Sequence, residues 1–447
     1  MKHLGGRAER GGGAAESSGA AEPRLFIWSA PDEKGETVLR EELAAWLQKT
    51  APEKFGDTAD ATVRRFGGAR TSHHTVRGAV VARDAERAVA LLRSARSEAR
   101  TRRGSGPRPI ALLFPGHGSQ QPRMGAGLYR RDPAFTAAMD EFFAGYEAAG
   151  GKPLTEEWLA EDPSVSIDSG ELGQPLLYAV GLALARMVES WGPRPTALLG
   201  HSIGELAAAT VSGVLGAADG ARLMAARSHT YAPVPAGGLL AVAASAEELA
   251  PYAVGEVSVA VVNGPRQTVL GAPEGQLAEV ERRLCADGFL ARRARIPQPF
   301  HTPHALVAAE LFEPAFSDVR LTPPVVPLYS SATGARVNEE EATRPRFWAR
   351  QMSDPVFFGP ALDTLLCDDE VLLVEAGPGR ALTTLALRHP AVARGDSDAV
   401  ALLPARGDAT GSADREEALW AAARLWTEGH SLDWRAVNAM AKFRLPV

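Results

Sequence analysis

Short apolar runs alternate along the middle of the chain with segments in which apolar residues recur at helical spacing. The runs are IALLFPG from Ile110, TALLG up to Gly200, VPLYSSATG and VLLVEAGPG. Apolar runs of this length predict buried strands, and the stretch IGELAAATVSG after the second run predicts a helix. Alternating strands and helices are typical of an α/β domain with a mainly parallel sheet. We therefore expect one large domain of this kind, built from residues 109–237 and 297–404.

Residues 238–296 interrupt this domain with a different order of elements. The order there is strand, helix, two strands, helix and strand, with GLLAVAAS, VSVAVVNGP, QTVLGAP and ARRARI as the strands. A βαββαβ order is that of the ferredoxin-like motif. We expect a ferredoxin-like small subdomain inserted into the large one.

The two ends of the chain differ from this body. Residues 1–22 lack apolar periodicity and are rich in small residues, so we expect a disordered arm. Residues 23–108 predict a small α/β unit: the strand LFIWSA, a helix through Leu39 and Leu47, a loop, the strand GAVVARD and a second helix. Residues 405–447 begin with a polar stretch, after which we expect an amphipathic helix and the extended segment FRLPV.

Composition narrows the possible functions. A net charge of −6 over 447 residues gives no electrostatic case for binding nucleic acid. Cys285 and Cys367 are the two cysteines, too few for a disulfide framework or a cysteine metal site. No apolar run approaches the ~20 residues of a membrane span, and the start does not resemble a signal peptide. We expect a cytoplasmic protein that needs no membrane, metal or prosthetic group.

The sharpest chemical signal is GHSIG, residues 200–204, which follows a predicted strand and opens a predicted helix. It matches the G-x-S-x-G nucleophile elbow, in which the glycines permit a strained turn that exposes the serine. Ser202 is therefore the candidate nucleophile. The backbone N–H of the following residue, Ile203, and the Gly-rich loop FPGHGSQ are candidate donors to an oxyanion.

A serine nucleophile needs a base, for which the sequence offers ten histidines. His201 adjoins Ser202, but its side chain should point away from the serine. His301, in PQPFHTPHA, lies where the chain re-enters the large domain. Taken alone, the pattern favours His301 only modestly.

Seven motifs occur in order: FPGHGSQ, QPLLYAVGLALAR, RPTALLGHSIGE, AAR, VVNGP, PFHTP and EAGPGRAL. Together they resemble the malonyl-CoA:acyl carrier protein transacylases, and specifically the acyltransferase domains of modular polyketide synthases. The flanks resemble the linker between ketosynthase and acyltransferase and the segment after the acyltransferase, so the similarity spans residues 24–447. It implies an α/β-hydrolase-like large subdomain, the inserted ferredoxin-like subdomain and an N-terminal α/β linker domain. It also implies a discrete acyltransferase acting in trans, or an excised domain.

The resemblance also implies roles for individual residues. Ser202 would carry the acyl group, His301 would be the general base, and the backbone N–H groups of His117 and Ile203 would form the oxyanion hole. The acyl donor would be a coenzyme A thioester, and the acceptor the phosphopantetheine thiol of an acyl carrier protein, within a polyketide synthase assembly.

Four further residues would contact the substrate. Arg227 occupies the position that pairs with the malonyl carboxylate, and a guanidinium fork suits a carboxylate. Gln174 and Asn263 would line the site. Phe300, before the histidine, would leave little room for an α-methyl group. It would therefore favour malonyl over methylmalonyl, but only by the ~1–3 kcal/mol of discrimination that one methylene group provides.

Departures from the family pattern keep alternatives open. They are His117 for glutamine, Gln298 and Pro299 for a His-Ala pair, His304 and Ala305 for Leu-Met, and Gln351 for asparagine. A non-malonyl acyl-CoA donor, a hydroxyl acceptor on a natural product, and an editing acyl hydrolase use the same serine and base. These stay alternatives to malonyl transfer.

Overall fold

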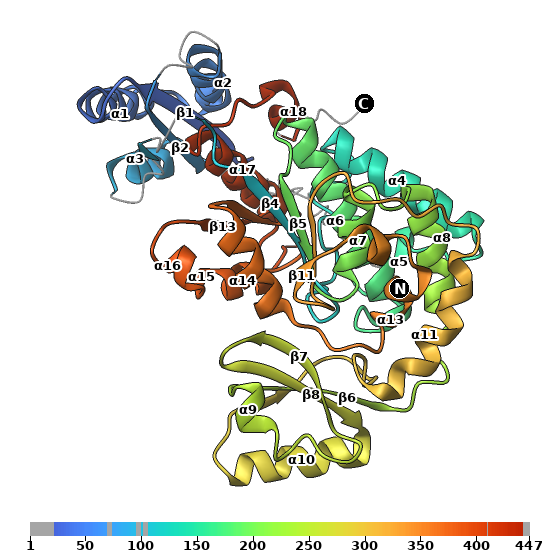
Figure 1. The fold of residues 1–447 in the computed structure, drawn as a ribbon. Coiled ribbons are helices and arrows are strands. Elements are labelled where there is room, and N and C mark those ends of the chain that lie inside the picture. The colour runs from blue at the N-terminus through green and yellow to red at the C-terminus, as the bar shows by residue number, and fades with distance from the viewer. Residues whose placement is uncertain (1–21, 69–73, 95–99, 102–105, 409, 441–447) are drawn as a thin grey trace, which may run out of the picture.

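The structure is a computed structural model that describes residues 22–68, 74–94, 100–101, 106–408 and 410–440. The predicted arm therefore falls outside the described residues except for Glu22, and the predicted extended segment FRLPV falls outside them as well. The described chain forms three sheets. Figure 1 shows the largest sheet in the centre, with the two smaller sheets at opposite ends of the molecule.

The central sheet carries the predicted apolar runs. Its six strands lie in the order β11-β10-β5-β4-β12-β13. Every neighbouring pair is parallel except β10 and β11, which confirms the predicted α/β class. The bounds are β4 Ile110–Phe114, β5 Ala197–Gly200, β10 Leu328–Ser330, β11 Ala335–Arg336, β12 Leu372–Glu375 and β13 Asp398–Ala401.

Helices cover this sheet. The longest, α6 (Gly170–Ser190), is apolar on all sides and buried almost throughout, as expected for a helix enclosed by other elements. It packs against α4, α7 and α8. The other helices of the large subdomain are α4 Pro133–Ala148, α5 Thr155–Leu159, α7 Gly204–Val211, α8 Ala217–Ser228, α11 Leu306–Phe312, α12 Glu339–Ala342, α13 Pro345–Arg350, α14 Phe358–Asp368, α15 Ala381–Leu387 and α16 Pro390–Ala393.

The inserted segment forms the predicted ferredoxin-like unit. Its elements are β6 Gly237–Val242, α9 Ala246–Leu249, β7 Ser258–Gly264, β8 Gln267–Pro273, α10 Glu274–Ala286 and β9 Ala291–Arg293. The strands lie in the order β7-β8-β6-β9, and all neighbours are antiparallel. Leu277, Val280 and Leu284 of α10 are buried against this sheet, at the spacing of one helix face. Edge strand β7 also meets the large subdomain, where Val262 N donates to Val356 O at 2.7 Å.

The N-terminal unit is a three-stranded antiparallel sheet, β1 Arg24–Ala30, β2 Val76–Ala82 and β3 Arg100–Thr101, with helices α1 Glu33–Gln48, α2 Phe55–Phe66 and α3 Ala85–Arg93. The prediction of a loop before β2 was wrong, because α2 occupies it. Phe55, Ala59, Val63 and Phe66 are buried at helical spacing, but Thr58 and Thr62 between them weaken the apolar pattern.

A helix from the other end of the chain completes this unit. Helix α17 (Ser412–Thr427) packs against β1 and β2 and also against β13 of the central sheet. Arg77 of β2 lies over the Trp426 ring at 4.1 Å and donates to His430 O at 2.8 Å. The short helix α18 (Trp434–Ala439) follows. The N-terminal sheet and the C-terminal helix α17 therefore pack directly against each other.

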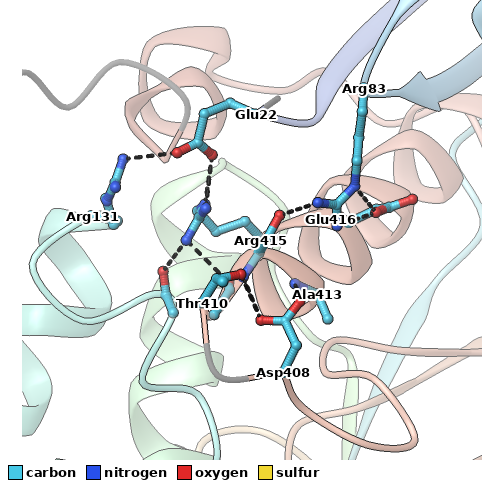
Figure 2. A network of polar contacts seen from close by, with 11 residues as sticks. Glu22, Arg83, Arg131, Asp408, Thr410, Ala413, Arg415 and Glu416 are labelled. Carbon is cyan, nitrogen blue, oxygen red and sulfur yellow. Dashed lines mark hydrogen bonds and ion pairs between the residues drawn. The ribbon is translucent and has the colours of Figure 1, made fainter. Parts of the chain in front are cut away.

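Ion pairs fix the start of α17 (Figure 2). The Glu22 carboxylate forms ion pairs with Arg415 at 2.8 Å and with Arg131 at 3.5 Å, measured from nitrogen to oxygen. Arg83 forms an ion pair with Glu416 at 2.6 Å. Asp408 accepts from the backbone N–H of Ala413 at 2.9 Å, which satisfies a free donor of the first helical turn. These contacts join the N-terminal unit, the large subdomain and α17.

Of the helices in the described ranges, none combines the length and apolar character that crossing a membrane requires. The domain boundaries proposed from the sequence stay predictions.

Candidate active site

The site begins at the turn between β5 and α7. Ser202 has φ of 54°, a left-handed conformation that is unfavourable for a residue with a Cβ. A Cβ on Gly200 would lie 2.3 Å from the backbone of Glu205, and one on Gly204 would lie 2.1 Å from Phe114 O. The two glycines therefore permit the close turn that lifts Ser202 out of the sheet, as the GHSIG pattern predicts.

His301 lies directly beside this serine. Its Nε2 is 2.7 Å from Ser202 Oγ, and its Nδ1 is 3.1 Å from the carbonyl of Asp354. The carbonyl only accepts, so Nδ1 carries the proton and Nε2 accepts from the serine hydroxyl. Burial lowers the pKa of His301 to about 3, with the neighbouring His201 adding to the effect. The imidazole is therefore neutral and able to take a proton at neutral pH.

Two backbone N–H groups flank the serine. Phe114 of β4 pairs with Gly200 of β5, so the loops that follow these parallel strands meet at one edge of the sheet. The loop after β4 contains His117, and the turn after β5 contains Ile203. Within the described part of the chain, no acceptor is found for the backbone N–H of either residue, as an oxyanion site requires.

A buried polar cluster extends from the serine toward α6 and α8. Arg227 of α8 is 3% exposed, and its Nε donates to Gln174 Oε1 of α6 at 2.9 Å. Tyr231 donates to the same oxygen at 2.9 Å. Phe300 meets the Tyr231 ring edge-on, with centroids 5.5 Å apart. The structure thus brings Arg227, Gln174 and Phe300 together, and adds Tyr231, which the sequence did not single out.

No carboxylate of the described residues lies within 4.0 Å of the Arg227 guanidinium. Its charge acts on the two histidines of the site, because it contributes to lowering the pKa of both His301 and His117. A buried cation without a counter-ion is costly. The arrangement favours a ligand that brings a negative charge.

Asn263 reaches the site from β7 of the small subdomain. Its Oδ1 accepts from His201 Nε2 at 3.0 Å, and the His201 ring packs against Phe358 with centroids 5.5 Å apart. The His201 side chain therefore has partners other than the Ser202 hydroxyl. Asn263 contacts the neighbour of the serine in this structure, and its contact with substrate stays a prediction.

Glu205 is a further buried group that the sequence did not single out. It accepts hydrogen bonds from Ser330 Oγ at 2.9 Å, from Ser331 Oγ, and from Gln351 Nε2 at 2.7 Å. Burial raises the pKa of Glu205 to about 7. The carboxyl ties α7, which begins just after the serine, to β10 and to the end of α13. Its place in GHSIGE, at the second residue of a buried helix, was the available signal.

In the described residues, no three or more His, Cys, Asp or Glu side chains are grouped so as to hold a metal ion. The groups assembled around Ser202 are a neutral base, two free backbone donors and a buried cation. This set suits acyl transfer to and from a serine hydroxyl.

Comparison with known proteins agrees with this chemistry. The family described as acyl transferase domain matches residues 111–423. One of the phenolphthiocerol/phthiocerol polyketide synthase subunits of Mycobacterium tuberculosis is 31% identical over 438 residues, which cover 94% of this chain and 29% of that protein. The chain thus spans less than a third of this relative.

Two solved structures are similar to this one. The acyl transferase domain of SpnD, in complex with 2-(pent-4-yn-1-yl)malonyl, has a TM-score of 0.81 and 28% identity over 94% of this chain and 98% of that one. The malonyl-CoA:acyl carrier protein transacylase FabD from Xanthomonas oryzae has a TM-score of 0.59 and 27% identity over 67% of this chain and 95% of that one. The resemblance inferred from the seven motifs is confirmed. The chain belongs to the acyl transferase domain family, and it is an acyltransferase of the kind built into polyketide synthases.

Proposed function

We propose that this acyltransferase moves a malonyl group from coenzyme A, through an ester on Ser202, to the phosphopantetheine thiol of an acyl carrier protein in a polyketide synthase assembly. Coenzyme A enters as the thioester substrate, and no other cofactor takes part. The observation that carries the proposal is Arg227, a buried cation that has no carboxylate partner among the described residues and lies in the same polar cluster as the serine and its base.

The malonyl carboxylate supplies the missing counter-ion. The Nε of Arg227 is already engaged by Gln174, which leaves its two Nη groups to hold both carboxylate oxygens in a fork. The SpnD domain carries a substituted malonyl group and FabD is a malonyl-CoA transacylase, which supports the same substrate class here. The Phe300 ring against Tyr231 restricts the space at the α-carbon, and malonyl is therefore favoured over methylmalonyl.

The first half-reaction forms the acyl-serine. Ser202 Oγ attacks the thioester carbonyl carbon while His301 Nε2 takes the hydroxyl proton. The carbonyl oxygen becomes an oxyanion that accepts from the N–H groups of His117 and Ile203. The C–S bond then breaks, and His301 returns the proton to the departing coenzyme A thiolate.

The second half-reaction reverses these steps with another thiol. His301 takes the proton of the phosphopantetheine thiol, the sulfur attacks the ester carbonyl, and the C–O bond to Ser202 breaks as His301 returns the proton to Oγ. The Asp354 carbonyl, at 3.1 Å from Nδ1, holds the imidazole in the tautomer that both halves need. Cys285 and Cys367 are free surface thiols, as expected in the reducing cytoplasm, where we place the reaction.

Loading of the purified protein tests the proposal. The protein is incubated separately with malonyl-CoA, methylmalonyl-CoA and acetyl-CoA, and the intact protein is weighed. We expect the malonyl adduct to form fastest and to disappear in Ser202→Ala. Arg227→Ala should lower malonyl loading about 30- to 150-fold, because a charge-assisted pair of ~2–3 kcal/mol is lost. The matched control is Arg222→Ala, an arginine on the same helix that pairs with Asp219 at the surface.

The fate of the acyl group tests the acceptor. Adding a carrier protein with its phosphopantetheine arm should move the malonyl group to that protein. Preferential loading of acetyl groups would overturn the substrate assignment. Release of free malonate at the same rate with and without the carrier protein would make the chain a hydrolase instead.

A further inference from the structure

The imidazole of His117 has two fixed partners that the proposed reaction does not use. The reaction needs only the backbone N–H of this residue. Its Nε2 lies 3.1 Å from the carbonyl oxygen of Asp168, and its Nδ1 lies 3.4 Å from Gln174 Nε2. Asp168 precedes helix α6 and Gln174 lies within its first two turns. The ring therefore spans from the loop in front of α6 to the residue that contacts Arg227.

The donors and acceptors along this chain of contacts are all determined. Gln174 Oε1 accepts from Arg227 Nε and from Tyr231 O–H, both at 2.9 Å. An amide has one oxygen and one NH₂ group, so the NH₂ of Gln174 faces His117. His117 Nδ1 must then accept, which places the ring proton on Nε2, where the Asp168 carbonyl accepts it.

The outer end of the chain is held in turn. Gln120 Nε2 donates to Asp168 Oδ1 at 2.7 Å, and Gly118 N donates to Gln120 Oε1 at 2.6 Å. His117, Gly118 and Gln120 belong to the loop after β4. Three hydrogen bonds join this loop to α6 and to Asp168 in front of it: two from His117 and one from Gln120. The ring cannot turn over without breaking the contact with Asp168 and presenting a wrong atom to Gln174.

We infer that His117 is a positioning residue for carboxylate recognition: its neutral imidazole fixes the amide orientation of Gln174, which in turn holds Arg227 and Tyr231. Without the ring, the Gln174 NH₂ loses its acceptor, and Arg227 and Tyr231 alone hold the amide in its orientation. Rotation by half a turn, which would bring two donors together at Arg227 Nε, then becomes less costly. The inference rests on the proposed function, because Arg227 must bind the acyl carboxylate for the orientation to affect substrate choice.

The test compares two donors that differ in the carboxylate. Loading efficiency, kcat/KM, is measured with malonyl-CoA and with acetyl-CoA for the wild-type protein and for His117→Leu, His117→Gln and His229→Leu. Leucine fills similar space without ring nitrogens. Glutamine restores one acceptor and one donor. His229 is exposed at the end of α8, and its side chain makes no hydrogen bond or ion pair within the described residues, so His229→Leu is the matched control.

We expect His117→Leu to lower the malonyl-to-acetyl ratio of kcat/KM about tenfold, mainly by raising KM for malonyl-CoA, because a hydrogen bond of ~1 kcal/mol is lost and a buried amide is left unpaired. His117→Gln should restore at least half of the lost ratio on a logarithmic scale, and His229→Leu should keep the wild-type ratio. Circular dichroism checks that all variants fold.

Two other outcomes have distinct meanings. If His117→Leu slows both donors equally, the ring serves only the oxyanion loop and the inference is wrong, while the proposed function stands. If the wild-type protein does not load malonyl at all, the proposed function fails and the inference fails with it.

Discussion

At the scale of single residues, the two groups expected to perform the chemistry both sit in a backbone conformation that side chains disfavour. Ser202 has φ of 54° and His301 has φ of 62°. Such conformations cost of order 1–3 kcal/mol and persist only where the surroundings determine them. For His301 the determining contacts are its N–H to Met352 O at 2.9 Å and its Nδ1 to Asp354 O at 3.1 Å. The fold thus supplies the base with its orientation through main-chain groups alone.

The buried base predicts an unusual pH profile. Because burial lowers the pKa of His301 to about 3, the free base is the main form down to well below the ordinary histidine pKa of ~6.5. We expect the rate of malonyl loading to change less than twofold between pH 8 and pH 5. Quenched loading reactions analysed by intact mass measure this rate.

Folding must be followed over the same range. A histidine with a lowered pKa contributes stability that is present above ~6.5 and is lost as pH falls from there toward 3, since the unfolded chain then binds the proton more readily. Circular dichroism at each pH separates unfolding from loss of catalysis. Half-loss of the rate near pH 6.5 in a fully folded protein would contradict the prediction.

Glu205 predicts the opposite dependence of stability on pH. Burial raises its pKa to about 7, so the folded protein retains a proton that the unfolded chain releases near pH 4.5. Its contribution to stability is therefore present below pH 4.5 and declines as pH rises through 7. We expect Glu205→Gln to gain about 1–3 kcal/mol of unfolding free energy relative to wild type between pH 5 and pH 8. Urea titrations at both pH values measure this difference, and a constant difference would count against the raised pKa.

The candidate residues differ in how far the sequence could predict them. Ser202 could be predicted because the GHSIG pattern is local, and its two glycines permit the turn that exposes the serine. Tyr231 and Glu205 were missed, because their partners come from helices and strands far along the chain. Asp354 could not be found by residue type at all, since it contributes only a carbonyl that every residue has.

At the scale of elements, strand β7 supports the serine and the histidine together. Val356 pairs with β7 through two hydrogen bonds, to Ala260 O at 2.9 Å and from Val262 N at 2.7 Å. Two residues before Val356, the Asp354 carbonyl orients His301. Asn263, later in the same strand, holds His201 beside Ser202. The small subdomain is thus part of the catalytic framework.

Removing one of these contacts tests that role. We expect Asn263→Ala to lower kcat for malonyl loading about tenfold, because the His201 N–H loses its acceptor and the nucleophile turn loosens, with a loss of ~1 kcal/mol in stability. Gln276→Ala is the control, since Gln276 contacts Glu256 at the surface of the same subdomain. Equal loading rates for the two variants would show that β7 has no part in positioning the serine.

The sequence predicted most strands of the central sheet, but it did not predict strand β13 or helix α2. Runs such as IALLF and LLVE are apolar throughout because both faces of a parallel sheet are covered. The strand β13, with the sequence DAVA, was not predicted, because it lies at the sheet edge and three of its four residues are only partly buried. Helix α2 was missed because threonines fill two of its buried positions.

At the scale of the whole molecule, the large subdomain meets the residue in front of α17 through a very close backbone contact. A Cβ on Gly127 would lie 2.0 Å from Gly411 O, just before α17. Both backbones are held in place. Arg415 of α17 donates to Gly411 O at 3.1 Å, and the Gly127 N–H donates to Asp414 Oδ2 at 3.0 Å. A side chain at position 127 therefore has no room, and only glycine fits there.

We therefore expect Gly127→Ala to destabilise the protein by about 2–3 kcal/mol, the upper part of the range for overpacked sites. The matched control is Gly275→Ala in the exposed part of α10, where an added Cβ has no atom within 4 Å. That change should be neutral or stabilising by up to ~1 kcal/mol, because alanine favours helix. Urea unfolding measures both, and equal stability of the two variants would contradict the tight contact.

The sequence predicted units at both ends but not that they pack together. Periodicity shows which face of a helix or strand is apolar, but it does not show which other element packs against that face. For α17 the burial of residues on all sides, among them Ala418, Leu419, Ala422 and Leu425, is consistent with partners on two sides. The partner sheet lies more than three hundred residues earlier in the chain.

That separation has a consequence for synthesis. The ribosome completes β2 at Ala82 and reaches α17 at Ser412 roughly 330 residues later, which takes about 15–70 s at ~5–20 residues per second. Throughout this interval the face of the N-terminal sheet that α17 will cover is open to water. The nascent chain thus carries an exposed apolar surface during this interval, and its yield in a host cell should depend on chaperones that act at the ribosome.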